Sequence, residues 1–212
     1  ESPYIFAAAN PVMNIDPDGR KTYTVDSVGY ITKLTDDKEF DKIITNKDGK
    51  TEEIWRGKHG TIQQAYFRYE VKGENKKYVG EYFIVDNDND GLDIFESLAE
   101  HYSGDNKHVE WSIIQTSDDD LEQFNYIMTS HLEGRERMGP RKFVDFIKNT
   151  KIRSYYHSHP SNTPYPSGIG DITGDIGFAK YIKKRVRYQI NTKIYLPGTH
   201  TYINYDKDSK KS

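Results

Sequence analysis

The sequence predicts an α+β fold, with a mixed β-sheet flanked by helices and preceded by a β-rich N-terminal segment. Two observations support this fold class. Short runs of alternating apolar and polar residues recur along the chain, as in half-buried strands, and only three longer segments are predicted as helices. The composition agrees, because 34% hydrophobic residues and 17 tyrosines among 212 residues suit a modest, tyrosine-rich core rather than a helical bundle. This length suits one full domain and a smaller one.

Charge and composition exclude several classes of function. The net charge of −3 offers no basic excess for a nucleic-acid backbone, so no nucleic-acid partner is expected. The chain has no cysteine, which rules out disulfides, cysteine-based zinc sites and thiol catalysis. No apolar run approaches the roughly 20 residues that a membrane span needs, and the chain does not start like a signal peptide.

The segment 21–85 is predicted to be a β-rich linker or small meander without a catalytic constellation. Its alternating runs and its Asp-Gly turn are typical of hairpins. The expected strands lie near residues 22–25, 30–34, 43–44, 54–55, 65–69 and 78–85.

The acidic segment 86–91 allows two interpretations. Alternating acids with Gly91 in the sixth place resemble the start of an EF-hand calcium loop. However, Ser97 stands in the twelfth place, where that loop needs a bidentate Glu. The favoured interpretation is an acidic turn whose carboxylates lie at the positive end of a following helix.

The segment 86–212 is predicted to form the main domain. Apolar residues at spacings of three and four predict a helix after Gly91. The further expected elements are strands near 109–114 and 123–129, a helix at 141–149, a strand ending at His157, a helix at 173–183, and strands near 188–194 and 201–205.

Two histidines at the end of a strand are the strongest chemical signal. His157 and His159 are two residues apart, so in an extended chain both imidazoles emerge on one face, and Pro160 then turns the chain out of the sheet. The loop that follows brings back a hydroxyl and a carboxylate. Two neutral imidazoles and one carboxylate are what a catalytic zinc needs, with a fourth position left for water.

His157-Ser158-His159-Pro160, Ser167 and Asp171 together resemble the JAMM signature of the JAB/MPN metallopeptidases. The spacing from His159 to Ser167 matches that family, whereas three residues rather than two separate Ser167 from Asp171. The resemblance implies a JAB/MPN-like, cytidine-deaminase-like layered fold, zinc held by the two histidines and Asp171, and a hydroxyl of Ser167 that hydrogen-bonds an oxyanion. Asp175 is the alternative third ligand.

The same resemblance implies a catalytic glutamate near the start of the strand after the first helix. Glu110 occupies that place, although Ile113 stands where the family commonly has glycine. Glu96 and Glu100, on the preceding helix, are weaker rivals for the role of general base.

The opening residues carry a second resemblance. Ser2-Pro3-Tyr4, Asn10-Pro11-Val12 and Ile15-Asp16-Pro17-Asp18-Gly19 closely resemble the end of the Rhs repeat-associated core. In that family the core forms a shell around a variable C-terminal toxin. The resemblance implies that residues 1–20 are the end of such a core.

Together the resemblances imply a zinc-dependent peptidase or isopeptidase that is secreted and delivered into a target cell by a bacterial producer. The expected partners are a protein substrate in that cell, a cognate immunity protein and the Rhs core shell. Three alternatives stay open: a catalytically inactive JAB/MPN scaffold that binds a partner, a metal-dependent nuclease toxin, and a structural cap of the Rhs core.

Overall fold

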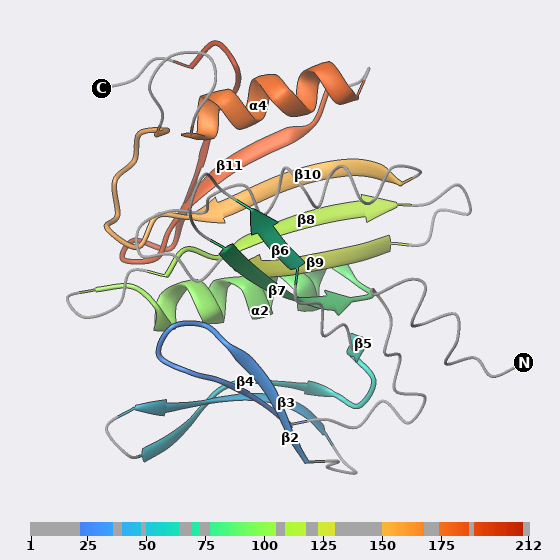
Figure 1. Cartoon of the computed structure of the whole chain (residues 1–212), viewed down its shortest axis with the longest axis vertical. Helices are drawn as coiled ribbons and strands as arrows, with labels where there is room; N and C mark the ends of the chain where they lie inside the picture. Colours follow the sequence, from blue (N-terminus) through green and yellow to red (C-terminus); the bar gives the residue numbers. More distant parts are fainter. Residues whose placement is uncertain are drawn as a thin grey trace, which may run out of the picture.

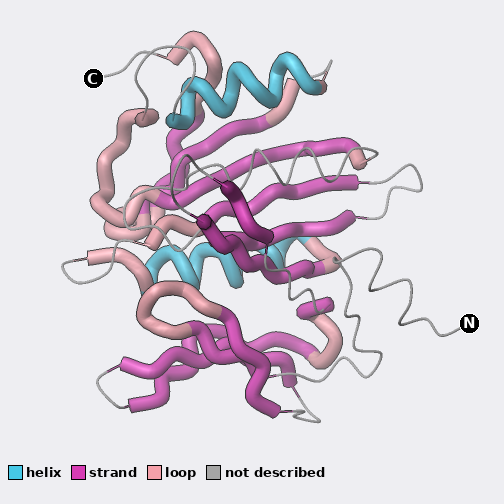
Figure 2. Tube along the Cα trace, in the orientation of Figure 1, coloured by secondary structure: helices cyan, strands magenta, loops and turns pink. Residues whose placement is uncertain are grey.

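The computed structural model describes residues 22–35, 40–47, 50–63, 69–72, 77–104, 109–117, 123–129, 150–167, 174–186 and 189–209. Three predictions therefore lie outside the described residues: the Rhs-like opening at 1–20, the helix at 141–149 and the placement of Asp171. The described parts contain two sheets and two helices, which confirms the mixed α+β architecture (Figures 1 and 2).

The larger sheet runs in the order β12-β11-β10-β8-β9-β7-β5, and β6 also pairs with β7. Its strands are β5 (Ile62–Gln63), β6 (Tyr69–Lys72), β7 (Lys77–Val85), β8 (Ser112–Ser117), β9 (Gln123–Thr129), β10 (Lys151–Ser158), β11 (Asn191–Leu196) and β12 (Thr201–Asn204). All neighbours in this sheet are antiparallel except β10 and β11. A parallel pair needs a crossover, and the segment between these two strands contains a helix.

The two helices cover opposite faces of the larger sheet (Figure 1). One is α2 (Asp88–His101), and the other is α4 (Gly174–Arg185). In α2, Phe95 and Leu98 are buried in the same apolar cluster as Tyr156 of β10. On the other face, Phe178 of α4 packs against Tyr155 of β10 with ring centroids 4.4 Å apart. Neither helix is long and apolar enough to cross a membrane.

The acidic segment before α2 forms the start of that helix, as the favoured interpretation predicts. Asn87 is the N-cap, and its side chain accepts a hydrogen bond of 2.8 Å from the backbone N–H of Asp90. Asp88 and Asp90 lie in the first turn, where negative charge complements the helix dipole. Packing accounts for the glycine, because a Cβ on Gly91 would lie 2.8 Å from Asn125 Cβ.

A smaller sheet lies beyond α2 (Figure 1). It has the order β2-β1-β3-β4. Its strands are β1 (Thr22–Val25), β2 (Ile31–Thr35), β3 (Phe40–Lys47) and β4 (Lys50–Lys58). The predicted hairpins are confirmed, since β1–β2 and β3–β4 are antiparallel pairs.

The two sheets share one apolar cluster. Val25, Ile43 and Trp55 of the smaller sheet belong to the same buried cluster as Phe95 of α2. The strand β7 lies inside the larger sheet, between β9 and β5. Part of the segment 21–85 is thus built into the sheet that carries β10. The domain boundary at residue 85 itself stays a prediction.

The strand β10 is the element that positions the histidines. Its successive side chains alternate between the two covered faces of the sheet, so Tyr156 points toward α2 while Tyr155 and His157 point toward α4. Lys151, at the start of this strand, is its one exposed residue. The strand therefore delivers His157 into a buried environment at its C-terminal end.

Candidate metal centre

His157 and His159 meet at the end of β10. Both side chains are buried, with 1% and 6% of their surfaces exposed. Their Nε2 atoms lie 3.1 Å apart. The sequence prediction that these two imidazoles emerge together is confirmed. Tyr155 stacks on the His157 ring and Tyr205 meets it edge-on, so the ring is held from two sides.

The tautomer of His159 follows from one hydrogen bond. Its Nδ1 lies 2.7 Å from the carbonyl oxygen of Thr163. A carbonyl can only accept, so Nδ1 carries the proton and Nε2 keeps a free lone pair. A histidine that donates through one nitrogen to a backbone carbonyl is oriented for metal binding through the other.

The carboxylate that the described residues bring to the histidines is Asp175, in the first turn of α4. Its Oδ1 lies 3.0 Å from His157 Nε2, and its Oδ2 lies 3.3 Å from His159 Nε2. Asp175 is the alternative ligand of the sequence analysis. Asp171, the preferred ligand there, lies outside the described residues.

The backbone of Ser167 is hydrogen-bonded to Asp175. The backbone N–H of Ser167 donates to Asp175 Oδ2, and the backbone N–H of Asp175 donates to the carbonyl of Ser167 at 3.1 Å. These two bonds hold Ser167 beside the first turn of α4. Ser167 itself is exposed, so the structure places it beside the carboxylate and open to solvent.

The donor set fits zinc. One ligand atom from each of His157, His159 and Asp175 lies within 4.8 Å of the others. Two ligands of a tetrahedral zinc with bonds of about 2.0–2.1 Å lie about 3.3 Å apart. The observed separations of 3.1, 3.0 and 3.3 Å are close to that spacing. Two imidazoles and one carboxylate also match a catalytic site with an open position.

His159 and Asp175 shift each other's pKa values. Burial on its own raises the pKa of Asp175, yet His157 and His159 hold the pKa of that carboxyl well below its usual range. Burial lowers the pKa of His159, but Asp175, the Thr163 carbonyl and Glu110 act against it, and the net direction is upward. The cluster thus favours a charged carboxylate among the imidazoles.

Glu110 lies two residues before β8. The last pair of the β8–β10 ladder is Ser112 with His157. One residue further, Ser158 N–H donates to the carbonyl of Trp111 at 2.8 Å, and Trp111 N–H donates to the Ser158 hydroxyl oxygen at 3.0 Å. The Glu110 carboxylate also acts on His159, whose pKa it helps to raise.

The rival carboxylates are engaged elsewhere. Glu96 Oε1 accepts a hydrogen bond of 2.7 Å from the Tyr202 hydroxyl. Glu100 Oε1 accepts one of 2.6 Å from the Tyr195 hydroxyl and lies 2.8 Å from His200 Nδ1. Tyr195 is buried in the cluster of α2, on the face of the sheet away from α4 and His157. Neither glutamate contacts the histidine cluster through these bonds, whereas the charge of Glu110 acts on His159.

Sequence reasoning missed the groups that brace the loop. Thr163 acts through its backbone carbonyl, for which no side-chain signal exists. Asn162 takes a positive φ of 56°, and its Oδ1 accepts a hydrogen bond of 2.6 Å from the backbone N–H of Gly198. Asparagine tolerates this left-handed conformation better than most residues, so the Ser-Asn run was a signal for a tight turn at this point.

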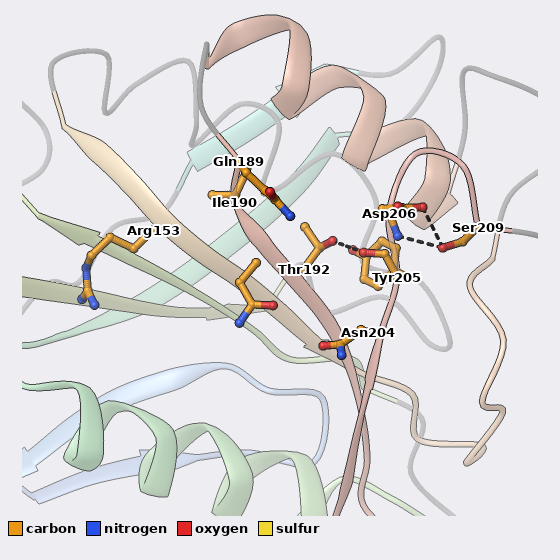
Figure 3. A pocket seen from close by; sticks show the side chains of 9 residues that line it. Arg153, Gln189, Ile190, Thr192, Asn204, Tyr205, Asp206 and Ser209 are labelled. Atoms are coloured by element: carbon orange, nitrogen blue, oxygen red, sulfur yellow. Dashed lines mark hydrogen bonds between the residues drawn. The ribbon is translucent and has the colours of Figure 1, made fainter.

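A separate polar cavity of about 610 Å³ opens beside β11 (Figure 3). It is lined by Arg153, Gln189, Ile190, Asn191, Thr192, Asn204, Tyr205, Asp206 and Ser209. None of the three ligand candidates lines it. Its link to the centre is Tyr205, whose ring contacts His157.

Comparison with known proteins gives one match. Residues 83–180 match the model of the family Toxin-JAB1, described as JAB-like toxin 1. No significant match was found among curated proteins or among solved structures. The matched stretch runs from β7 into α4 and so contains every residue of the candidate centre.

Proposed function

We propose that the chain is a zinc-dependent peptidase or isopeptidase toxin, because residues 83–180 match the family of JAB-like toxin 1. The observation that carries this proposal is the cluster of His157, His159 and Asp175, whose ligand atoms converge within 4.8 Å. The charge of Glu110 acts on His159, which supports Glu110 as the general base. The family match supports the toxin class, and the histidine and aspartate cluster supports the metal-dependent hydrolysis.

Two imidazoles and one carboxylate would hold the metal. His159 is fixed by the Thr163 carbonyl and His157 by the rings around it, while Asp175 is carried on the rigid start of α4. When bound, zinc lowers the pKa of a bound water to about 7 and polarises a carbonyl oxygen.

Glu110 would move the protons of the reaction. Its carboxylate accepts a proton from the attacking water and then gives it to the leaving amine. The main chain at this position is anchored from β9, because the Thr129 hydroxyl donates a hydrogen bond of 2.9 Å to the Glu110 carbonyl. This anchor limits the movement of the base relative to His159.

Ser167 would stabilise the developing oxyanion through its hydroxyl. The residue is exposed, and its backbone is tied to Asp175 in both directions. The exposure of Ser167 and its backbone link to Asp175 support this role toward a substrate carbonyl that approaches from solvent. The products are a carboxylate and an amine, so the bond broken is a peptide or isopeptide bond.

We also propose how this toxin is delivered and controlled. The chain is delivered by a bacterial producer into a target cell, where it cuts a protein. Residues 1–20 are the end of an Rhs core that encloses the toxin before delivery. The producer protects itself with a cognate immunity protein that blocks the site.

Glu110→Gln tests the proposal, with Glu96→Gln as the matched control. Each variant removes one carboxylate charge at nearly constant volume, and Glu96 interacts with Tyr202 instead of with the centre. We expect Glu110→Gln to abolish growth inhibition in an expressing host, while purified protein keeps its zinc by elemental analysis. Glu96→Gln should stay toxic. Proteomic mapping of new amino termini should show cleavage with the wild type only.

Other outcomes identify the alternatives. A wild-type protein purified without zinc, and unable to take it up, would favour the inactive scaffold. A toxin whose activity survives Glu110→Gln would refute the proposed base. Degradation of plasmid DNA or total RNA by the wild type would favour a nuclease instead.

A further inference from the structure

One ring nitrogen of the centre is buried without a partner among the described residues. His157 Nδ1 makes no hydrogen bond there, although the side chain is only 1% exposed. When Nε2 faces a metal, Nδ1 carries the proton and becomes a buried donor. The matching nitrogen of His159 already has the Thr163 carbonyl. Among the described residues, His157 therefore has no second contact of the kind that fixes a metal-binding imidazole.

A second unpartnered polar atom lies directly across the ladder. Ser112 is fully buried, and its Oγ has no hydrogen bond among the described residues. Ser112 and His157 are paired in the antiparallel register of β8 and β10. The neighbouring pair, Ser158 with Trp111, is hydrogen-bonded, so Ser112 and His157 form a non-hydrogen-bonded pair. In such pairs the side chains share one face, with Cβ atoms about 4.5–5.5 Å apart.

We infer that Ser112 is a positioning residue whose hydroxyl accepts the Nδ1–H of His157 and fixes the ring with Nε2 toward Asp175. Nδ1 is the ring nitrogen nearest the backbone, and Oγ is one bond from its own Cβ. Rotation about the Cα–Cβ bond of Ser112 moves Oγ alone between staggered positions. A hydroxyl can also donate, so it serves either tautomer of the imidazole. The inference rests on the metal centre of the proposed function.

Two other buried groups compete for this role. Trp111 Nε1 is also unpartnered in the described structure, but indole N–H is a donor and cannot accept from Nδ1–H. The Tyr205 hydroxyl is unpartnered as well, and its ring meets His157 edge-on at 5.6 Å. Register places Ser112 beside the backbone end of the imidazole, where Nδ1 lies. Tyr205 is therefore the rival that an experiment must separate from Ser112.

The test measures the zinc affinity of the full chain. Metal-free protein competes for zinc with a chromogenic chelator. We expect Ser112→Ala to weaken zinc binding by about 10- to 100-fold, the usual cost of losing a partner of a ligand histidine. Tyr205→Phe should bind with nearly wild-type affinity. Thr45→Val is the matched control, because Thr45 in the smaller sheet also carries a buried, unpartnered hydroxyl. Thermal melts of the metal-free proteins check folding.

A measurement on the zinc-loaded wild type needs no variant. The His157 Nδ1–H should give a slowly exchanging ring proton in NMR spectra, with a nuclear Overhauser contact to the Ser112 β-protons. Unchanged affinity in Ser112→Ala, or contacts of this proton to Tyr205 without Ser112, would overturn the inference and leave the metal centre standing. A wild type that takes up no zinc would overturn the centre and the inference together.

Discussion

Replacing Asp175 by asparagine should destroy zinc binding while leaving the loop closed. Asparagine has nearly the same volume, and its carbonyl oxygen still accepts the backbone N–H of Ser167 that Asp175 Oδ2 accepts now. What is lost is the negative charge that lies 3.0 Å from His157 Nε2 and 3.3 Å from His159 Nε2. The Asp175 side chain is only 13% exposed, so water is a poor substitute for it.

The expected loss of zinc affinity in Asp175→Asn follows from the position of Asp175 as a ligand. Loss of a group that only supports a ligand costs about 10- to 100-fold in metal affinity. Loss of a ligand itself should exceed about 100-fold, or about 2.7 kcal/mol of binding free energy. Chelator competition on metal-free Asp175→Asn measures this directly, and Asp171→Asn is the paired variant. We expect the Asp171 variant to bind zinc within a few-fold of wild type.

The reverse result would refute this reasoning. If Asp171→Asn loses zinc and Asp175→Asn keeps it, the third ligand is Asp171, as the sequence analysis preferred, and Asp175 does not bind the metal. Equal losses in both variants would mean that both carboxylates contribute. Melting curves of the metal-free variants separate ligand loss from unfolding.

Three further predictions concern stability. Arg153 hydrogen-bonds Asp88 through both guanidinium NH₂ groups, at 2.6 and 2.7 Å, and holds the pKa of that carboxyl below its ordinary value of 3.8. Asp88→Asn should therefore lower the free energy of unfolding by about 1–2 kcal/mol above pH 4. This difference between variant and wild type should vanish as the pH falls through the lowered pKa of Asp88, and urea titrations that find the same difference at every pH would contradict this. Asn162→Ala should be less stable than Asn162→Gly by about 1 kcal/mol, since only glycine adopts the positive φ of 56° without strain, and equal denaturant midpoints would disprove it. Gly91→Ala should destabilise by about 1–3 kcal/mol although alanine favours helices, because the new Cβ meets Asn125 at 2.8 Å; a stabilised variant in thermal melts would show that this contact relaxes.

The fold class could be predicted because its signals are local. Alternation of apolar and polar residues marks strands, and the β9 prediction at 123–129 agrees with the structure. Boundaries set by capping and pairing were harder to predict. The helix α2 begins at Asp88, before its apolar periodicity starts, because Asn87 caps it. The strand β8 begins at Ser112, although the alternation starts at Val109.

The centre was predictable to the extent that its spacing is local. His157 and His159 meet because two residues of extended chain share a face, which follows from the sequence alone. Asp175 could not be selected over Asp171 in that way. Which carboxylate reaches the histidines depends on where α4 starts and how it lies on the sheet, and this is a matter of packing.

The sequence by itself determined the chemical types at this site and their order along the chain: a glutamate, a His-x-His-Pro turn at a strand end, and a serine followed by carboxylates. It also excluded cysteine chemistry. Only the tertiary structure brought Asp175 of α4 to the two histidines and brought the charge of Glu110 to act on His159. The physical reason is range: side-chain periodicity is fixed by backbone dihedrals within a few residues, whereas distances between remote residues depend on strand register and helix docking.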